Sequence, residues 1–445
     1  MAIDKTSRNA KSSVGKLQTS LQTKAKTEPA YRFHSLIDKL WRRDILLEAY
    51  RRCRANAGAP GVDKETFGQI DQRLNSWLEN LGQELQSGAY RPQPLLRVWI
   101  PKSNGGQRPL SIPTIKDRVV QMAMVLVISP IFEEDFLPEQ YGFRPGRDAK
   151  MAIRQVFWHV SQHGRTEVVD ADLRDYFNAI PHGQLMFSLR RRIADGRILH
   201  MIRCWLMAPV IEEHGGKLSR TTQARKTRRG VPQGGPLSPL LANIYFRRFA
   251  LAWRQSGVQA SLGAYVVNYA DDFVICCRPG LASAAKFRME RIMSKIGLEV
   301  NADKTHIADL TQERITFLGY DLGRYYGKGG RPFIGTKPSR KAVKSLRKRI
   351  HDRTTPQWYP DTPENTVMVI NRLLRGWSQY FDQGPVLDTY REISTYVDRR
   401  LRHWLVRRTR QRGRGFKAFS QKYLHETLGL YRLPSRRKDL SSAKV

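Results

Sequence analysis

Two adjacent aspartates interrupt an apolar stretch of the chain. Residues 264–277 read AYVVNYADDFVICC, so Asp271 and Asp272 stand between two short runs of β-branched and aromatic residues. Such runs predict two buried strands that meet at a tight turn with the aspartates at its tip. A buried carboxylate without a countercharge is costly, and a divalent cation would remove that cost. The alternative is ordinary solvated turn chemistry, in which Asp is common.

A second acidic segment lies upstream of this turn. Residues 166–182 read TEVVDADLRDYFNAIPH, which begins as a strand and delivers Asp170 and Asp172 at its end. Carboxylates from two strand ends can converge on a pair of metal ions, an arrangement that suits in-line phosphoryl transfer. The alternative is that these aspartates and Asp175 cap the helix that follows. We expect Asp175 to cap that helix and Asp172 to bind metal.

The charge balance indicates a polyanionic partner. The chain carries 77 Lys+Arg against 40 Asp+Glu, a formal net charge of +37. Residues 331–445 hold 27 Lys+Arg and 9 Asp+Glu, which leaves +18 in that segment. Because neutralising phosphates releases condensed counterions, this segment predicts a nucleic-acid surface. A solvated face or an attraction to anionic lipid would also fit the charge, but no apolar run approaches the ~20 residues that span a bilayer.

Cysteine usage and the N-terminus bear on the compartment. Cys53, Cys204, Cys276 and Cys277 include no C-x-x-C pair. This pattern predicts neither a disulfide framework nor a zinc site and fits a reducing cytosol. Residues 1–29 are polar, contain no secretory apolar region and predict a disordered basic arm. We expect a cytoplasmic protein.

The segments between these features predict an alternation of helices and strands. Residues 30–89 and 114–160 have helical spacing, and the basic loop at 142–147 interrupts the second stretch. Residues 95–113 predict a hairpin that turns at 104–106 and carries Lys102 and Arg108 at one end. Two cations on a rigid hairpin suit a triphosphate. Exposed basic residues that protect an edge strand from aggregation are an equal alternative.

The remaining segments add a glycine pair and a basic C-terminal region. Gly234 and Gly235 would let backbone approach a ligand closely, Gln233 offers an amide, and a helix starts near Ser238. A helix at 281–296 and a strand pair at 314–335 follow, and from Pro338 onward the pattern is helical, basic and aromatic. Trp377, Tyr380 and Phe381 share one helical face, which favours core packing over base stacking.

The ordered set of motifs resembles one family over about residues 35–435. The motifs are GVDKETF at 61–67, IPKSNGGQRPLSIP at 100–113, YGFRPGR at 141–147, DADLRDYFNAIPH at 170–182, VPQGGPLSPLLANI at 231–244, YADD at 269–272, GLEVNADKT at 297–305, ITFLGY at 315–320 and RGWSQYF at 375–381. In this order they resemble the reverse transcriptases encoded by bacterial group II introns, which double as splicing maturases.

The resemblance implies an α+β fold, a right-hand polymerase with an antiparallel sheet in its fingers and palm followed by a helical thumb. Residues 30–89 would form an N-terminal extension, 90–335 the fingers and palm, and 338–445 the basic thumb and maturase domain. Asp172, Asp271 and Asp272 match the catalytic carboxylates, which would hold two Mg²⁺ ions, with Mn²⁺ as a substitute. In the nucleotide site, Lys102 and Arg108 match the family's triphosphate ligands. Phe177 matches the ring at the sugar 2′ position, and Gln233 matches a residue that contacts the nucleotide. Lys304 matches a general acid. The RNA contacts we expect are Arg144, Arg147, Lys341, Lys344, Arg347, Lys348, Arg407 and Arg408.

The implied partners are intron RNA, an RNA template, a DNA primer or target, and dNTPs, in a bacterial cytoplasm near RNA or the nucleoid, with no membrane. A monomer and a homodimer both remain open. Many family members continue into an endonuclease module with paired Cys, and no Cys follows Cys277 here. We therefore expect no cleavage of a second target strand and priming from an existing DNA end.

The expected function is RNA-directed DNA polymerisation of intron RNA, together with support of intron splicing and mobility. Two alternatives are an RNA-binding splicing factor without polymerase activity and a related polymerase recruited for DNA repair or phage defence.

Overall fold

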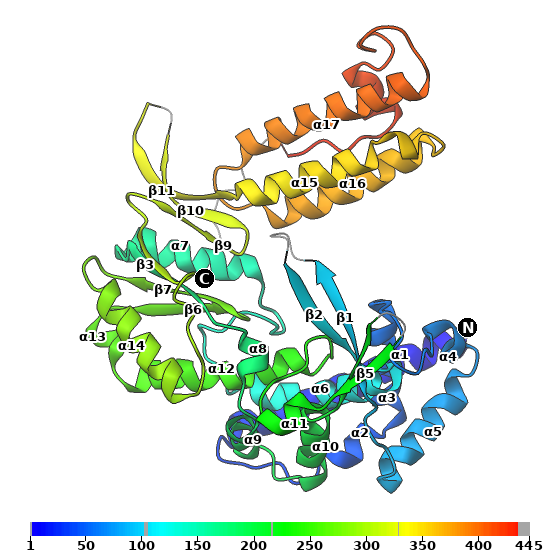
Figure 1. Ribbon diagram of the computed structural model, residues 1–445, viewed down its shortest axis with the longest axis vertical. Coiled ribbons are helices and arrows are strands. Elements are labelled where there is room, and N and C mark those ends of the chain that lie inside the picture. Colours follow the sequence, from blue (N-terminus) through cyan, green and yellow to red (C-terminus); the bar gives the residue numbers. More distant parts are fainter. Residues whose placement is uncertain (1, 102–105, 215–216, 328, 435–445) are drawn as a thin grey trace.

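A four-stranded antiparallel sheet lies at the centre of the molecule. The computed structural model describes residues 2–101, 106–214, 217–327 and 329–434 (Figure 1). The central sheet has the order β6-β7-β3-β8. Its strands are β3 (Glu167–Asp172), β6 (Tyr265–Tyr269), β7 (Asp272–Cys277) and β8 (His306–Asp309). The predicted pair of strands around the two aspartates is therefore confirmed.

Helices cover both faces of this sheet. Alternate strand residues point to opposite faces, so Val168 packs with α7 (Ala149–His163) while Val169 packs with the cluster that includes α12 (Ser238–Gln255) and α14 (Ala282–Lys295). The predicted helix start near Ser238 is confirmed. Short helices connect these elements: α8 (Tyr176–Ala179), α9 (His182–Arg190), α10 (Gly196–Leu206), α11 (Gln223–Thr227) and α13 (Val258–Ser261).

A second sheet has the strand order β2-β1-β4-β5 and includes the segment that was predicted to bind a triphosphate. The predicted hairpin is confirmed as β1 (Leu95–Pro101) and β2 (Gln107–Ile112), in antiparallel register with Ile100 opposite Arg108. The hairpin β4 (Val210–His214) and β5 (Lys217–Thr221) was not predicted. Its strand β4 pairs in parallel with β1, a contact between segments more than 100 residues apart that local patterns do not reveal.

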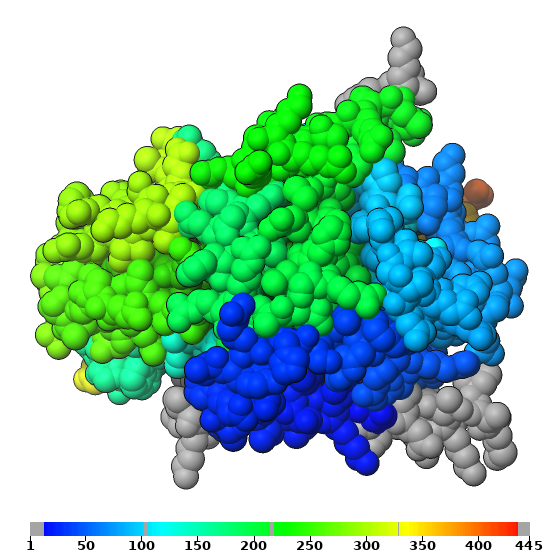
Figure 2. Space-filling view, turned by 90° about the horizontal axis from the view of Figure 1, so that it is seen from below, coloured from blue at the N-terminus to red at the C-terminus, as the bar shows by residue number. Residues whose placement is uncertain are grey.

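The N-terminal helices pack around α6 (Ile115–Glu133). They are α1 (Ala2–Thr27), α2 (Ile37–Leu40), α3 (Arg43–Ala55), α4 (Phe67–Asp71) and α5 (Leu74–Ser87). Figure 2, seen from below, shows these blue helices against the green middle of the chain. In the described part of the chain, no helix has the length and apolar character needed to cross a membrane.

The disordered arm predicted for residues 1–29 is wrong for the described residues, because residues 2–27 form α1. Val14, Leu21 and Ala25 are buried, and the Gln18 amide donates to the carbonyl oxygen of Leu126 on α6 at 2.9 Å. Val14, Leu17, Leu21 and Ala25 are spaced by three or four residues, which is one face of a helix. Many polar residues lie between these apolar positions, so the apolar face was not recognised in the sequence.

The C-terminal region is a three-stranded sheet followed by a helical unit, which stands above the rest of the molecule in Figure 1. The sheet comprises β9 (Arg314–Phe317), β10 (Tyr320–Tyr326) and β11 (Pro332–Pro338), one strand more than predicted. The helical elements are α15 (Arg340–Arg353), the 3-10 helix η1 (Pro356–Trp358), α16 (Pro363–Tyr380), α17 (Leu387–Arg408) and the π-helix η2 (Tyr423–Thr427).

The aromatic residues at the end of α16 join this helical unit to the sheet. Phe381 is buried, with its ring centroid 4.8 Å from that of Trp377 and 5.0 Å from that of Tyr320 on β10. The Tyr380 hydroxyl donates to the carbonyl oxygen of Leu318 at 2.9 Å. The predicted core packing of Trp377, Tyr380 and Phe381 is confirmed.

His159 on α7 stabilises the packing of this helix against β6 only in its neutral form. Its ring stacks on Tyr265, 4.8 Å between centroids, and its Nδ1 lies 3.3 Å from Nη1 of Arg165, which can only donate. Burial, with the charges of Arg165 and His163, lowers the pKa of His159 to about 3.

We therefore predict that the folded protein loses stability as the pH falls below about 6.5, the pKa of an unperturbed His. Below that pH the unfolded chain binds a proton at His159 that the folded chain does not bind until about pH 3, so unfolding is favoured. Chemical denaturation of the wild type and His159→Gln at pH 7.5 and pH 5 measures this. The wild type should lose more stability than the variant, and equal losses would contradict the assignment.

Candidate active site

The two acidic strand ends meet at one edge of the central sheet. Asp172 is the last residue of β3, Asp272 is the first of β7, and the two lie directly opposite each other in the antiparallel register. Cross-strand partners share one face of a sheet, with Cβ atoms ~5 Å apart. Asp271 precedes them in the turn between β6 and β7. The expected convergence of the two segments is therefore observed.

The turn that carries Asp271 is held in place by the loop before α7. Ala270 has a φ of 60°, a left-handed conformation that is uncommon for a residue other than Gly. A Cβ on Gly142 would lie 2.3 Å from the backbone nitrogen of Ala270, so only Gly permits this approach. The Tyr141 N–H donates to Asn268 O at 2.8 Å, and the buried Asn243 amide donates to Gly142 O at 2.6 Å. The loop thus runs beside β6 and supports the turn.

The carboxylates create an excess of negative charge. Although the Asp272 side chain reaches solvent, the protein packed around it raises its pKa to about 6, aided by the charges of Asp271, Asp172 and Asp170 and opposed by Lys304. Burial likewise raises the pKa of Asp170 to about 6, with His306 opposing and Asp172 adding to the rise. A cation placed among these groups would relieve the repulsion.

Asp172 is positioned by the segment before β8. Its Oδ2 lies 3.2 Å from Nζ of Lys304 and accepts from the Asn301 amide at 3.1 Å. Its backbone N–H donates to Oγ1 of Thr305 at 3.2 Å, and its carbonyl oxygen accepts from the Asn301 N–H at 2.8 Å. The sequence placed Lys304 near the site but missed Asn301 and Thr305. Their only signal was a polar run within the GLEVNADKT motif.

These residues fit a divalent metal ion by the chemistry of their donors. Carboxylate oxygens are what Mg²⁺ prefers, and the shared repulsion favours a cation among them. In the described part of the chain, however, no three Asp, Glu, His or Cys side chains are placed so that they could ligate one ion as they stand. The Asp172 carboxylate lies 3.2 Å from the Lys304 ammonium group in this arrangement.

A cavity of about 750 Å³ contains three of the predicted nucleotide-binding residues, Arg108, Phe177 and Gln233. The Arg108 Nε donates to Oε1 of Gln233 at 2.8 Å, and the Gln233 carbonyl oxygen accepts from the Ser111 N–H at 2.7 Å. Lys304 lies instead beside Asp172. Lys102 lies outside the described residues.

The glycine pair of this cavity has a packing role. A Cβ on Gly234 would lie 2.5 Å from the carbonyl oxygen of Ser111 on β2, and a Cβ on Gly235 would lie 2.3 Å from Oε1 of Gln121 on α6. Both glycines therefore let backbone approach protein atoms. This explains the pair without the ligand contact that the sequence suggested.

Phe143 and Lys341 also line the cavity, and sequence reasoning did not assign them to it. Phe143 is 54% exposed and has a φ of 57°, a strained backbone for an aromatic residue. Its signal in the sequence was an aromatic residue inside a basic loop. Lys341 comes from α15, so the cavity is bounded by the C-terminal helical unit as well.

The predicted RNA-binding cations divide into exposed and internally bonded groups. Lys341, Lys344 and Lys348 on α15 and Arg407 on α17 are exposed. In the second group, Arg347 pairs with Glu392 at 2.6 Å, and the Arg408 Nε donates to Tyr359 O at 3.0 Å. RNA contact by both groups stays a prediction.

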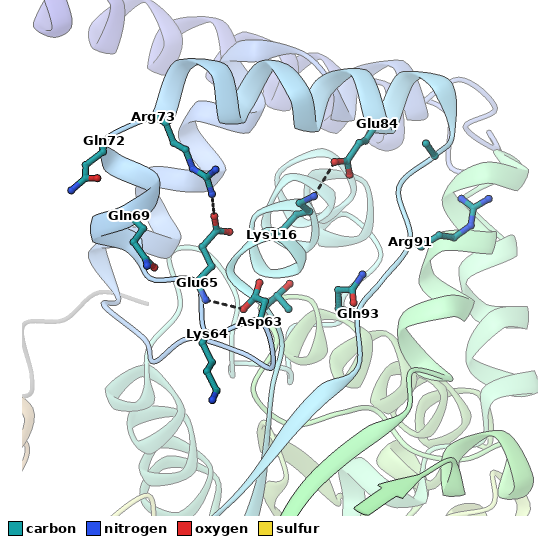
Figure 3. Close-up of a pocket in the computed structure, with 12 residues that line it drawn as sticks. Asp63, Lys64, Glu65, Gln69, Gln72, Arg73, Glu84, Arg91, Gln93 and Lys116 are labelled. Atoms are coloured by element: carbon teal, nitrogen blue, oxygen red, sulfur yellow. Dashed lines mark hydrogen bonds and ion pairs between the residues drawn. The ribbon is translucent and has the colours of Figure 1, made fainter. Parts of the chain in front are cut away.

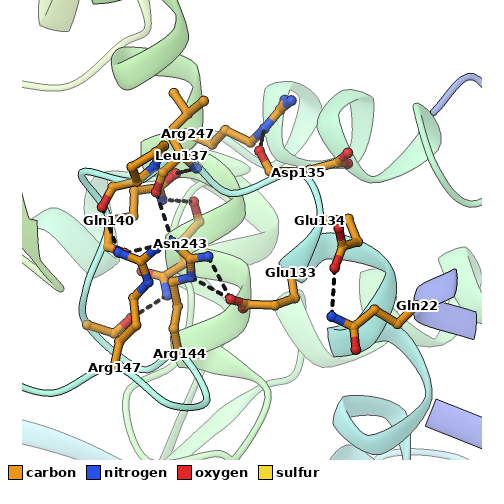
Figure 4. Close-up of polar contacts among 12 residues, drawn as sticks. Gln22, Glu133, Glu134, Asp135, Leu137, Gln140, Arg144, Arg147, Asn243 and Arg247 are labelled. Atoms are coloured by element: carbon orange, nitrogen blue, oxygen red, sulfur yellow. Dashed lines mark hydrogen bonds and ion pairs between the residues drawn. The ribbon is translucent and has the colours of Figure 1, made fainter. Parts of the chain in front are cut away.

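Arg144 has a structural role in the loop that carries it (Figure 4). Its side chain is buried, with Nη2 2.6 Å from Oε1 of Glu133 and with Nη1 donating to the carbonyl oxygens of Leu137 and Gln140 at 2.8 Å. Sequence reasoning did not foresee this internal role, and RNA contact by Arg144 stays a prediction. Arg147 is half-buried and donates to Pro138 O at 2.7 Å.

The capping role expected of Asp175 is wrong. Asp175 occupies the residue before α8 with a φ of 46°, and its side chain makes no capping hydrogen bond to the helix backbone. Its carboxylate oxygens instead accept from the side-chain amide of Asn178, both at 2.9 Å.

A larger polar cavity, of about 960 Å³, lies among α4, α5 and the start of α6, separate from the three aspartates (Figure 3). Four of its charged residues form two ion pairs: Arg73 contacts Glu65, and Lys116 lies 2.9 Å from Glu84. The acidic turn, where carboxylates from two strand ends meet, remains the candidate site.

Comparison with known proteins identifies the family. A model described as "Reverse transcriptase (RNA-dependent DNA polymerase)" matches residues 100–322, and one described as "Group II intron, maturase-specific domain" matches residues 343–424. Protein YkfC of Escherichia coli is 34% identical over 366 residues, which cover 74% of this chain and 93% of that protein.

Two longer relatives are matched over part of their length. The group II intron-encoded protein LtrA of Lactococcus lactis is 34% identical over 218 residues, 48% of this chain and 34% of LtrA. An uncharacterized 91 kDa protein in the cob intron of Schizosaccharomyces pombe is 25% identical over 417 residues, 77% of this chain and 50% of that protein. The chain thus spans half or less of these two relatives.

The chain belongs to the group II intron-encoded reverse transcriptases and maturases. It is an RNA-directed DNA polymerase of α+β fold that carries a maturase-specific domain and binds RNA.

We predict that Gly142→Ala impairs polymerisation far more than it lowers the melting temperature. The added methyl group must displace the backbone at Ala270 and with it Asp271. Gly183→Ala is the matched control, since its Cβ would meet no atom within 4 Å. Primer extension and thermal unfolding of both variants measure the effect. Wild-type activity in Gly142→Ala would show that the loop does not position the turn.

Proposed function

We propose that Asp172, Asp271 and Asp272 hold two Mg²⁺ ions, which Mn²⁺ can replace, and that this site adds dNTPs to a DNA primer paired with an RNA template. The observation that supports this most directly is the register that sets Asp172 opposite Asp272 beside the turn with Asp271. When bound, the metal ions would lower the pKa of the primer 3′-hydroxyl and neutralise charge on the leaving diphosphate.

The residues of the 750 Å³ cavity bind and orient the nucleotide in this proposal. Arg108 offers a guanidinium fork to the triphosphate, and its bond to Gln233 holds that fork at the cavity wall. The ring of Phe177, which is only 7% exposed, is fixed by packing and occupies the place where a ribose 2′-hydroxyl would lie. A rigid ring excludes the ribonucleotide by steric contact, whereas a mobile side chain would move aside.

Lys304 supplies a proton to the departing diphosphate. In the structure its ammonium group pairs with Asp172 and stays 64% exposed at the side chain, so it is free to turn toward a phosphate. A cation that binds Asp172 would weaken this pair and release the lysine. The Asp172 carboxylate would thus first keep Lys304 near the site and would then serve as a metal ligand.

The basic C-terminal helices bind intron RNA and support splicing and mobility. Exposed Lys344 and Lys348 lie on α15, and the maturase-specific model matches residues 343–424 around them. In the same proposal, residues 30–89 form an N-terminal extension, 90–335 the fingers and palm, and 338–445 the thumb and maturase domain. Phosphate contacts by lysines are independent of the carboxylates, so RNA binding and polymerisation are separable.

We predict that Asp172→Asn, and separately the double variant Asp271→Ala, Asp272→Ala, lowers primer extension on an RNA template by about 10³-fold or more. The amide or methyl groups cannot balance the charge of the metal ions. Binding of intron RNA, measured by filter retention, should stay within about twofold of the wild type.

Asp175→Asn is the matched control for these variants. It removes an exposed carboxylate three residues from Asp172 that bonds only to Asn178 among the described residues, and it should retain wild-type extension. Full activity of the double variant would overturn the proposed site.

A further inference from the structure

Asp271 differs from Asp172 in how its side chain is supported. Asn301 and Lys304 contact the Asp172 carboxylate directly. Within the described residues, by contrast, the exposed Asp271 carboxylate accepts no hydrogen bond and forms no ion pair. Its position is therefore set by the backbone of the turn between β6 and β7. Whatever holds this backbone decides where the Asp271 carboxylate lies.

Asn268, on β6, contacts the turn with its side-chain amide. Its Nδ2 donates to the carbonyl oxygen of Ala270 at 2.8 Å and to that of Asp272 at 3.4 Å. The Ala270 carbonyl belongs to the peptide unit that joins Ala270 to Asp271. Because a peptide unit is planar, fixing its oxygen also fixes the nitrogen and Cα of Asp271. The Asn268 amide is thus bonded to the backbone unit that carries the Asp271 carboxylate.

The hydrogen bond also stabilises an uncommon backbone conformation. Ala270 has a φ of 60°, in the left-handed region where a residue with a Cβ is strained. Such a conformation persists only where the surrounding structure holds it. Without the Asn268 donor, we expect the turn to adopt other conformations as well, and these would move Asp271.

The backbone of Asn268 is itself fixed on both sides. The residue is fully buried and lies opposite Phe273 on β7. On the other side, its N–H donates to the carbonyl oxygen of Glu139, and its carbonyl oxygen accepts from the N–H of Tyr141, both at 2.8 Å. The side-chain amide therefore reaches the turn from a backbone that cannot shift easily.

The surroundings of Asn268 indicate that its contribution is the donor. It shares one face of β6 with Val266, which belongs to the apolar cluster that includes α12 and α14. An amide among apolar side chains is costly unless its polar atoms are hydrogen-bonded. Among the described residues, Oδ1 of Asn268 has no hydrogen-bond partner, whereas Nδ2 has two. Within this costly arrangement, only the donor side of the amide makes contacts, and both are to the turn.

We propose that Asn268 is a positioning residue for metal binding, whose amide holds the turn in the one conformation from which Asp271 and Asp272 bind a cation. The assignment rests on the proposed function, because it names a residue that supports the proposed metal site. A turn that adopts several conformations presents both carboxylates only part of the time, which lowers the apparent metal affinity by that fraction. Saturating metal then restores most of the rate.

Asn268→Leu tests this role, because leucine branches at the same atom as asparagine and has no donor. Binding of Mn²⁺ to the protein without nucleic acid or nucleotide is measured from the EPR signal of the free ion. The variant should bind Mn²⁺ about tenfold more weakly than the wild type. Primer extension should need about tenfold more Mg²⁺ for half its maximal rate and should approach the wild-type rate at saturating Mg²⁺. Asn268→Ala, which adds no atom that could clash, should show the same shifts.

Asn371→Leu is the matched control. The Asn371 amide also donates to a backbone carbonyl oxygen, that of Gly429 at 2.8 Å, but it lies on α16 in the C-terminal helical unit. This variant should keep the wild-type Mn²⁺ affinity and Mg²⁺ requirement.

The positioning role is overturned if either Asn268 variant keeps both the Mn²⁺ affinity and the Mg²⁺ requirement of the wild type. It is also overturned if the variants lose extension equally at every Mg²⁺ concentration, because a merely structural defect would do this. Mn²⁺ binding that survives Asp271→Ala with Asp272→Ala would instead defeat the proposed metal site, and the positioning role with it.

Discussion

The structure depends on the antiparallel register of β3 and β7, which forces carboxylates together. Asp172 and Asp272 cannot separate without breaking the ladder of six paired positions that joins the two strands. The protein packed around Asp272 and, after it, the charges of the neighbouring aspartates raise the pKa of this side chain to about 6. The fold therefore holds several carboxylates close together, and a bound cation would relieve the repulsion between them. Functional sites of this kind keep side chains where the chemistry requires them, although this arrangement lowers the stability of the fold.

Elements on all sides maintain this arrangement. The Gly142 loop supports the turn from one side, and Asn301 and Thr305 fix Asp172 from the other. The β1–β2 hairpin and α15 bring Arg108 and Lys341 to one cavity, although the two residues are far apart in the chain. The function therefore depends on contacts between segments that are distant in the chain. These segments are positioned relative to one another by the rigid central sheet.

The sequence alone predicted the parts that local patterns encode. Strands around the Asp271 turn, the β1–β2 hairpin and the packing of Phe381 follow from alternation, turn residues and helical spacing. The pairing of β4 with β1 does not follow from such local patterns, because it joins residues more than 100 positions apart. The contact of Arg144 with Glu133 was not predicted, because residue type and position do not reveal which partner an arginine meets. Asp175 failed as a cap because its partner is the Asn178 side chain.

The most direct measurement is the anomalous scattering of Mn²⁺ in crystals of the protein with an RNA template, a DNA primer and a dNTP. The account predicts two manganese positions, with oxygens of Asp172 and Asp271 within about 2.2 Å of the metal and Lys304 turned away from Asp172. Manganese bound elsewhere, with Asp172 still paired to Lys304, would contradict it.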